Sequence, residues 1–197
     1  MIAAFIILLP LATFGVRGAA RPAAAAGDVS NIRQVDFKNF IYVRLAEGDE
    51  AKAIQLRRGT YESADGAQTF LMRVGYGDLT GDGEEEAVVI LRGQATRTSR
   101  TLDEVFIYTL AKGMVVPVAN FAGGKRGDYI CCVNSPENSF RIENQYLVLD
   151  LAVALDGDPQ CDPTRYYTIK YRWDGHRMAE VERSPLTPLP EHRREVG

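Results

Sequence analysis

The chain has 197 residues, of which 46% are hydrophobic and 25% are charged, and its formal net charge is −3. This balance is typical of a folded domain with a sizeable core and excludes a disordered chain. The sequence contains no basic block long enough to neutralise a row of phosphates, so we expect no nucleic-acid partner.

An apolar segment opens the chain and runs from Ile2 to Val16, with alanine-rich sequence after it as far as Ala26. An apolar run that ends in small residues is typical of a signal peptide, so residues 1–26 are predicted to be cleaved and the protein to be periplasmic or extracellular. Arg17 and Arg21 lie after the apolar run and no basic residue precedes it. An uncleaved anchor, which would be the protein's contact with a membrane, is therefore the alternative.

Residues 27–183 are predicted to form a single β domain. A period-two apolar pattern over residues 31–45 predicts one strand, or two strands broken near Lys38 and Asn39. A weaker strand signal covers residues 53–62 and is interrupted by Gly59. An Asp-Gly pair at positions 65 and 66 then predicts a turn.

The next strand is predicted to place four apolar side chains on one face: Phe70, Met72, Val74 and Tyr76. Residues 87–91 are apolar at every position, as expected of a central strand that is covered on both faces. Residues 105–110 and 114–121 flank a short polar segment that contains Gly113, which predicts a hairpin.

Further strands are predicted over residues 129–133, 146–155, 167–173 and 178–181. The third of these alternates cleanly and is predicted to place four residues on one face: Tyr167, Ile169, Tyr171 and Trp173. Residues 184–197 contain three prolines and are predicted to be a flexible tail. Nine or ten strands joined by tight turns predict an all-β fold, an antiparallel meander that forms a sandwich or partial barrel.

An acidic loop separates the strand that ends near Tyr76 from the apolar strand that begins at Ala87. Oxygen donors recur at every second position of this loop, as a hard cation such as calcium requires. The candidate ligands are the side chains of Asp78, Thr80 and Asp82, the carbonyl of Glu84 and the closing carboxylate of Glu86. Gly83 would supply the sharp turn, whereas Val89 at the twelfth position excludes an EF-hand. The sequence therefore predicts calcium as a cofactor.

This loop resembles the strand-loop-strand calcium loops of integrin-type FG-GAP repeats, whose pattern is D-x-N/D-x-D-G-x-x-D. Here Thr80 stands where that pattern has Asn or Asp, and Glu86 stands in place of its final Asp. The stretch YGDLTGDGEEEAVV is also similar to segments of secreted bacterial proteins. The resemblance covers the loop and its flanking strands, and it implies calcium binding and a location outside the cytoplasm rather than an activity.

The three cysteines are Cys131, Cys132 and Cys161. In an exported protein we expect Cys161 to form a disulfide with either Cys131 or Cys132, because adjacent residues of a strand point to opposite faces. One thiol would then remain unpaired. The chain-entropy model gives such a bond about 3–4 kcal/mol of stabilisation.

The sequence predicts no catalytic residues. The two histidines, His176 and His192, do not follow a nucleophile motif, and the sequence contains no G-x-S-x-G. The hypothesis is an exported, non-catalytic domain that binds a protein or cell-envelope partner and is stabilised by calcium. Two alternatives remain open: a secreted hydrolase that uses a metal held by the carboxylates, and a purely structural domain of the cell envelope.

Overall fold

The computed structural model describes residues 29–43, 53–94, 101–124, 128–129, 140–153, 155, 158 and 163–189. Within these ranges the chain forms thirteen strands and two short 3-10 helices, and every strand pairing is antiparallel. The predicted all-β, antiparallel fold is confirmed. The predicted signal peptide lies outside the described residues.

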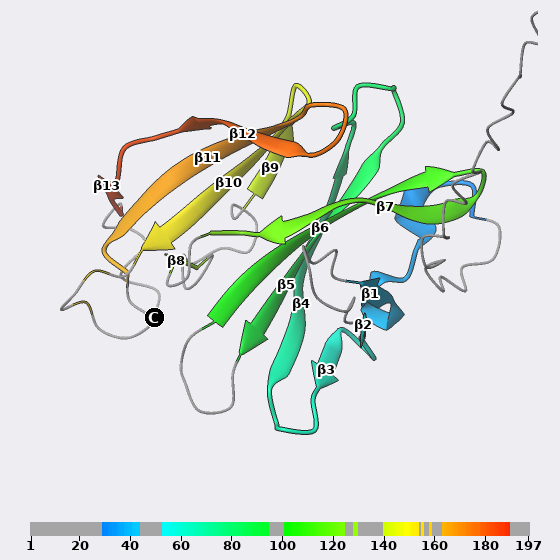
Figure 1. Cartoon of the computed structure of the whole chain (residues 1–197), viewed down its shortest axis with the longest axis horizontal. Coiled ribbons are helices and arrows are strands. Elements are labelled where there is room, and N and C mark those ends of the chain that lie inside the picture. Colours follow the sequence, from blue (N-terminus) through cyan, green and yellow to red (C-terminus); the bar gives the residue numbers. More distant parts are fainter. Residues whose placement is uncertain are drawn as a thin grey trace, which may run out of the picture.

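Two sheets form the body of the domain (Figure 1). The first has the order β3 (Thr60–Glu62), β4 (Gln68–Gly77), β5 (Glu86–Gln94), β6 (Thr101–Ala111), β7 (Met114–Ala122). The second has the order β12 (Met178–Arg183), β11 (Arg165–Trp173), β10 (Tyr146–Val153), β8 (Asp128–Tyr129). Off that path, β9 (Phe140–Glu143) pairs with β10, and β13 (Thr187–Pro188) pairs with β11.

The five-stranded sheet lies in the middle of the molecule and is covered on both faces. Ala87, Val89 and Leu91 of β5 belong to one core, and Val88 and Ile90 belong to a second core shared with the six-stranded sheet. All five residues are at most 1% exposed. The prediction of a central strand covered on both sides is confirmed, and burial of both faces explains why residues 87–91 of β5 are apolar at every position.

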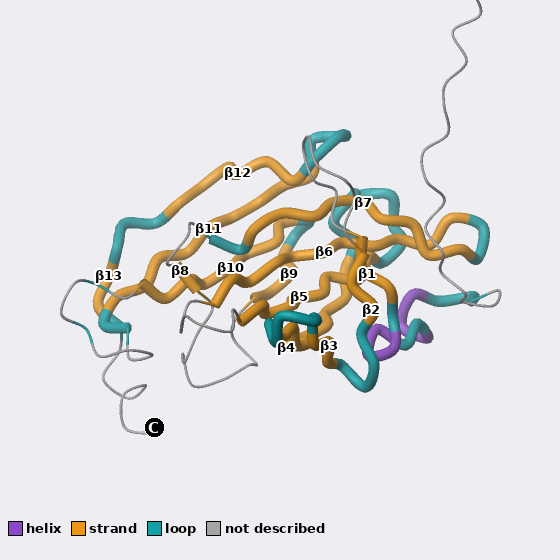
Figure 2. Tube along the Cα trace, turned by 60° about the horizontal axis from the view of Figure 1, so that its bottom comes forward, coloured by secondary structure: helices purple, strands orange, loops and turns teal. Residues whose placement is uncertain are grey.

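The outer cover of the first core comes from the N-terminal part of the described chain. The 3-10 helices η1 (Ile32–Gln34) and η2 (Phe37–Asn39) precede a small sheet of β1 (Ile41–Val43) and β2 (Ala53–Gln55), as Figure 2 shows. The predicted strand over residues 31–45 is therefore wrong over its first half. Asn31 and Asp36 each accept a backbone N–H bond as N-caps, which starts a helical turn where the apolar spacing alone favours a strand.

The face prediction for β4 is also wrong in part. The pairing of β4 with β5 shifts between Leu71 and Arg73, so Met72 is the extra residue of a β-bulge and is 40% exposed. After the bulge, Val74 and Tyr76 pack with Leu71 against the first core. A bulge exchanges the faces of the residues on its two sides, and the sequence period alone does not reveal one.

Other predicted elements are confirmed. The β6–β7 hairpin turns at Lys112 and Gly113, which both have positive φ. On β11, the four side chains predicted to share a face all contribute to the second core: Tyr167, Ile169, Tyr171 and Trp173. The short strands β9 and β13 were not predicted, and the predicted strand over residues 53–62 divides into β2 and β3, which explains the difference from nine or ten strands. The short strand β8 overlaps the start of the strand predicted over residues 129–133. Within the predicted tail, Thr187 pairs with Tyr166.

Candidate functional site

The acidic loop connects β4 to β5 and contacts both sheets. Leu79 is 2% exposed and belongs to the core shared with the six-stranded sheet. The remaining loop residues rise from this buried anchor toward the surface, where Asp82, Gly83 and Glu84 are exposed. The loop is therefore fastened at its base and open at its tip.

Backbone N–H groups fix the two aspartates of the loop. Gly81 N–H donates to Asp78 Oδ1 (2.6 Å) and Gly83 N–H donates to Asp78 Oδ2 (3.2 Å). Asp82 Oδ1 accepts the N–H of Glu84 (2.9 Å). Gly81 and Gly83 have φ of 81° and 89°, a region that glycine enters without steric cost. The loop thus holds its carboxylates in place through its own main chain.

Glu86 closes the loop from the inside and is 0% exposed. Its Oε2 accepts the N–H groups of Leu79 (2.8 Å) and Thr80 (3.1 Å), and its Oε1 accepts the Thr80 hydroxyl (3.3 Å). Burial raises the pKa of Glu86 and the nearby charge of Asp82 adds to the rise, while the bonds from Leu79, Thr80 and the Thr109 side chain oppose it. Glu86 therefore joins the two ends of the loop to β6.

Glu85 points away from this interior and pairs with η1. Arg33 donates to it through Nε (2.6 Å) and Nη2 (2.8 Å), and the guanidinium lies 4.7 Å from the centre of the Tyr76 ring. The hydrogen bonds from Arg33 hold the pKa of Glu85 below its usual range. This exposed bidentate pair links the loop to the layer that covers the first core.

Three glycines of this region lie against the β9–β10 hairpin. A Cβ on Gly75 would come 2.6 Å from Phe140, and one on Gly77 would come 2.8 Å from Ile142. A Cβ on Gly81 would come 3.2 Å from the side-chain oxygen of Gln145. The β9–β10 hairpin can pack closely against this backbone only because Gly75, Gly77 and Gly81 lack a Cβ, and we call these three residues the glycine seat. Sequence reasoning missed this role, although glycine within a strand is a signal of close backbone approach.

The predicted calcium ligands are thus partly brought together. All of the predicted ligand atoms are oxygens, which suits a hard cation. Asp82 is exposed and Asp78 is half-buried, and each accepts main-chain N–H bonds of the loop, whereas Thr80 and Glu86 are bonded to each other. Among the described residues no group of three or more His, Cys, Asp or Glu side chains is close enough to hold a metal ion. Calcium binding therefore stays a prediction.

The other sequence-predicted candidates give less information. Cys131, Cys132 and Cys161 lie outside the described residues, as does His192. His176 is exposed in the β11–β12 turn, where its N–H donates to Asp174 Oδ1 (2.9 Å). The disulfide prediction is therefore untested.

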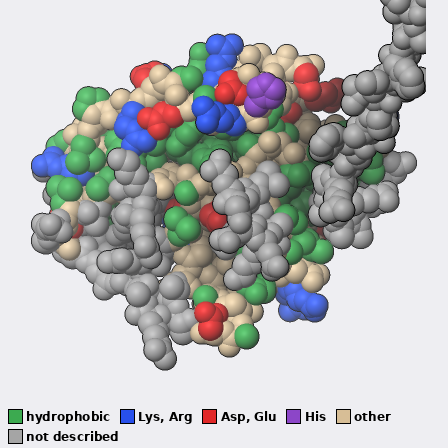
Figure 3. Space-filling model, in the orientation of Figure 1, with side chains coloured by type: hydrophobic (Ala, Val, Ile, Leu, Met, Phe, Trp, Pro, Cys, Tyr) green, Lys and Arg blue, Asp and Glu red, His purple; other side chains and the backbone are tan. Residues whose placement is uncertain are grey.

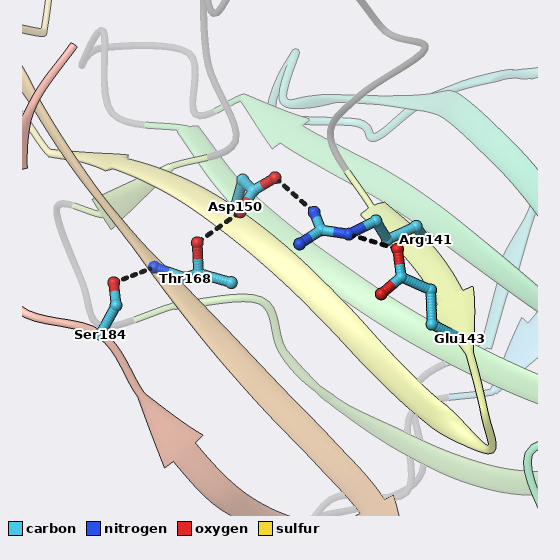
Figure 4. Close-up of polar contacts among 5 residues, drawn as sticks. All are labelled: Arg141, Glu143, Asp150, Thr168 and Ser184. Carbon is cyan, nitrogen blue, oxygen red and sulfur yellow. Dashed lines mark hydrogen bonds and ion pairs between the residues drawn. The ribbon is translucent and has the colours of Figure 1, made fainter.

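A second polar cluster lies on the outer face of the six-stranded sheet (Figure 4). Arg141 contacts both Glu143 (2.8 Å) and Asp150 (2.8 Å), and Asp150 also accepts the Thr168 hydroxyl (2.6 Å). The Thr168 N–H donates to the Ser184 hydroxyl oxygen (2.9 Å). These bonds tie β9, β10, β11 and the segment after β12 together, so each of these side chains serves the sheet.

Comparisons with protein-family models, curated proteins and solved structures found no match. In the part of the chain that the structure describes, no helix has both the length and the apolar character needed to cross a membrane.

Proposed function

We propose that the chain is an exported β domain that acts by binding rather than by catalysis, and that calcium stabilises its acidic loop. The observation that carries the calcium proposal is that one short loop holds the carboxylates of both Asp78 and Asp82. Each carboxylate accepts main-chain N–H bonds of that loop. A preorganised pair of carboxylates lowers the cost of assembling a cation site.

In this proposal Asp78 and Asp82 hold the ion, together with the main-chain carbonyl of Glu84. Thr80 and Glu86 do not bind the ion in this proposal. Their hydrogen bond positions the start of the loop relative to its end. Calcium would supply positive charge among carboxylates that otherwise repel one another. The FG-GAP-like pattern of the sequence supports the same assignment.

The binding role is supported by how the buried carboxylates are used. Glu86 and Asp103 are the buried acidic residues of the described chain. Glu86 bonds to its own loop, and Asp103 forms a bidentate pair with Arg92 (2.8 and 2.9 Å). Acid–base catalysis needs a group that can exchange protons with a substrate, whereas these two groups have partners within the fold.

A structural role in the cell envelope is the second candidate, and a specific observation favours it. The acidic loop touches η1 through Glu85, β6 through Glu86 and the β9–β10 hairpin through its glycines. A loop with that many contacts stabilises the fold with or without an ion.

Export and a disulfide of Cys161 with Cys131 or Cys132 belong to both proposals. Thiol labelling of denatured, unreduced protein should then find one reactive group per chain, and three would exclude the disulfide.

The calcium proposal is tested by thermal unfolding with calcium and with chelator at matched ionic strength. Binding to the native state alone stabilises by about 2.7 kcal/mol when free calcium is 100 times its dissociation constant. We expect the melting temperature to rise with calcium, and Asp82→Ala to abolish that rise. Glu85→Ala is the matched control, since it removes the same charge from the same loop but from the side that faces Arg33. Identical melting of the unmutated protein in both conditions would refute the calcium site and favour the structural role.

A further inference from the structure

A groove of about 550 Å³ lies at the free edge of the five-stranded sheet. It is bordered by β2, the turn after β2, β3 and the beginning of β4, which lie side by side in Figures 1 and 2. Its volume is within the range of about 300–1,000 Å³ typical of small-molecule sites. Its lining includes the side chains of Gln55, Arg57, Glu62, Gln68 and Phe70.

The register of β3 and β4 determines which of the groove side chains lie on the same face of the sheet. Glu62 pairs directly with Gln68, and the next pair in that register, Thr60 with Phe70, lies on the same face of the sheet. The carboxylate, the amide and the Phe70 ring therefore stand next to one another. Phe70 is half-buried and lines the groove.

The turn that presents Arg57 is held firmly. Residues Arg58 and Gly59 both have positive φ, and Arg57 and Thr60 bond to each other across the turn (2.8 and 3.1 Å). Gly59 N–H also donates to the Lys38 carbonyl (2.7 Å), and Leu71 N–H donates to the Gly59 carbonyl (2.8 Å). The groove wall is thus anchored to η2 and to β4. This anchoring limits the conformational entropy that the protein would lose if ligand binding ordered the wall.

The polar side chains of this groove are uncommitted. In the described part of the chain, Gln55, Arg57, Glu62 and Gln68 make no side-chain hydrogen bond or ion pair. A second groove, of about 390 Å³ on the outer face of the six-stranded sheet, differs in this respect, because its Lys170 is paired with Glu182 at 2.7 Å. Figure 3 shows basic and acidic side chains mixed along the upper edge of the molecule, where β11 and β12 lie.

We propose that the groove between β2 and β4 binds a neutral saccharide, which gives the proposed binding role, on which this inference rests, a ligand class. Sugar hydroxyls both donate and accept hydrogen bonds, and the amides of Gln55 and Gln68 offer both functions at fixed spacing. Arg57 and Glu62 add strong donors and acceptors while their charges offset, which favours an uncharged ligand. The ring of Phe70 offers an apolar surface for the C–H face of a sugar ring.

The test is a titration of the folded domain with cellotetraose and with chitotetraose, followed by NMR chemical shifts. We expect saturable binding of at least one of the two, weakened about tenfold or more by Arg57→Ala and by Gln68→Ala, which each remove hydrogen bonds from an exposed position. Lys170→Ala, in the second groove, is the control and should bind as the unmutated protein does. The melting temperature of each variant verifies that it is folded.

The proposal is overturned if neither saccharide binds saturably, or if Arg57→Ala and Gln68→Ala bind with unchanged affinity. The same titration with Asp82→Ala separates it from the calcium proposal. Saccharide binding should persist in that variant, because the acidic loop does not line the groove. Loss of the calcium response with retained saccharide binding is the result that both proposals predict for this variant. Saccharide binding by an unmutated protein whose melting temperature does not respond to calcium would refute the calcium proposal alone.

Discussion

The β4–β5 loop and the β11–β12 turn both begin with an aspartate that accepts two backbone N–H bonds. Asp78 accepts from Gly81 and Gly83, and Asp174 accepts from His176 and Arg177 (both 2.9 Å). Both segments also contain glycines with positive φ. Read as local sequence, they are two acidic turns of the same kind.

Their surroundings differ. A Cβ on Gly175, in the second turn, would meet no atom within 4 Å, whereas one on Gly81 would meet Gln145 of the other sheet. The first loop also ends in Glu86, which is fully buried, while the second is exposed throughout. The aspartate bonds therefore shape a turn, and burial of Glu86 together with the glycine seat makes one of the turns a junction between sheets.

Removing Glu86 should convert the junction into a plain turn, and this is the largest effect we expect. Glu86→Ala leaves the N–H groups of Leu79 and Thr80 without their partner, and buried unpaired groups of this kind cost about 2–4 kcal/mol in total. Urea unfolding measures the loss. Glu86→Gln is the matched control, because its carbonyl can still accept both N–H bonds. Equal stability of the Ala and Gln variants would contradict the assigned role.

The stability difference between the unmutated protein and Glu86→Gln should depend on pH. Burial raises the pKa of Glu86 above 4.5, so its protonated form is the one that folding favours. The stability of the unmutated protein relative to Glu86→Gln should therefore fall as the pH rises from 4.5 through the folded-state pKa. For Asp174 the hydrogen bonds from Arg177 and His176 lower the pKa below 3.8, so its contribution should instead be lost on acidification.

Filling the glycine seat should have the next largest effect. In Gly75→Ala the new methyl would lie 2.6 Å from the ring of Phe140, which is 3% exposed and enclosed by the second core. Overpacking of this kind costs about 1–3 kcal/mol, or about 2–4 °C of melting temperature per kcal/mol for a chain of this size. Gly93→Ala, on the neighbouring strand, would place its methyl 3.7 Å from the nearest atom and should be tolerated. Similar melting temperatures of the two variants would contradict the close packing of Gly75 against Phe140.

The fold was largely accessible from the sequence wherever a strand has one environment along its length. Residues 87–91 of β5 and the apolar face of β11 are such segments, and their apolar patterns predict their burial correctly. The first half of residues 31–45 was misread because two polar caps, Asn31 and Asp36, outweigh the apolar spacing that surrounds them. The face of β4 was misread because the bulge at Met72 depends on the partner strand.

The candidate site divides in the same way. The oxygen spacing of the loop could be read from the sequence. The seat for β9 could not, because the contact of Gly77 with Ile142 joins segments that are far apart in the chain. Glu86 lies directly before the covered residues 87–91, but its place in the sequence does not distinguish a metal ligand from an internal hydrogen-bond acceptor.

Asp174→Ala should have the smallest effect of the set. The turn is exposed on every side, so water can replace the two hydrogen bonds that the side chain accepts. We expect a melting temperature close to that of the unmutated protein and clearly above that of Glu86→Ala. A loss as large as that of Glu86→Ala would mean that the two segments do not differ as described.

Hydrogen exchange of the backbone amides tests the junction most directly. We expect Glu86→Ala to lower protection in the β4–β5 loop and also in β9, since Gly75 and Gly77 contact Phe140 and Ile142. Asp174→Ala should lower protection only in the β11–β12 turn. Loss of protection in Glu86→Ala that stops at the loop, with β9 exchanging as in the unmutated protein, would contradict the claim that this loop joins the two sheets.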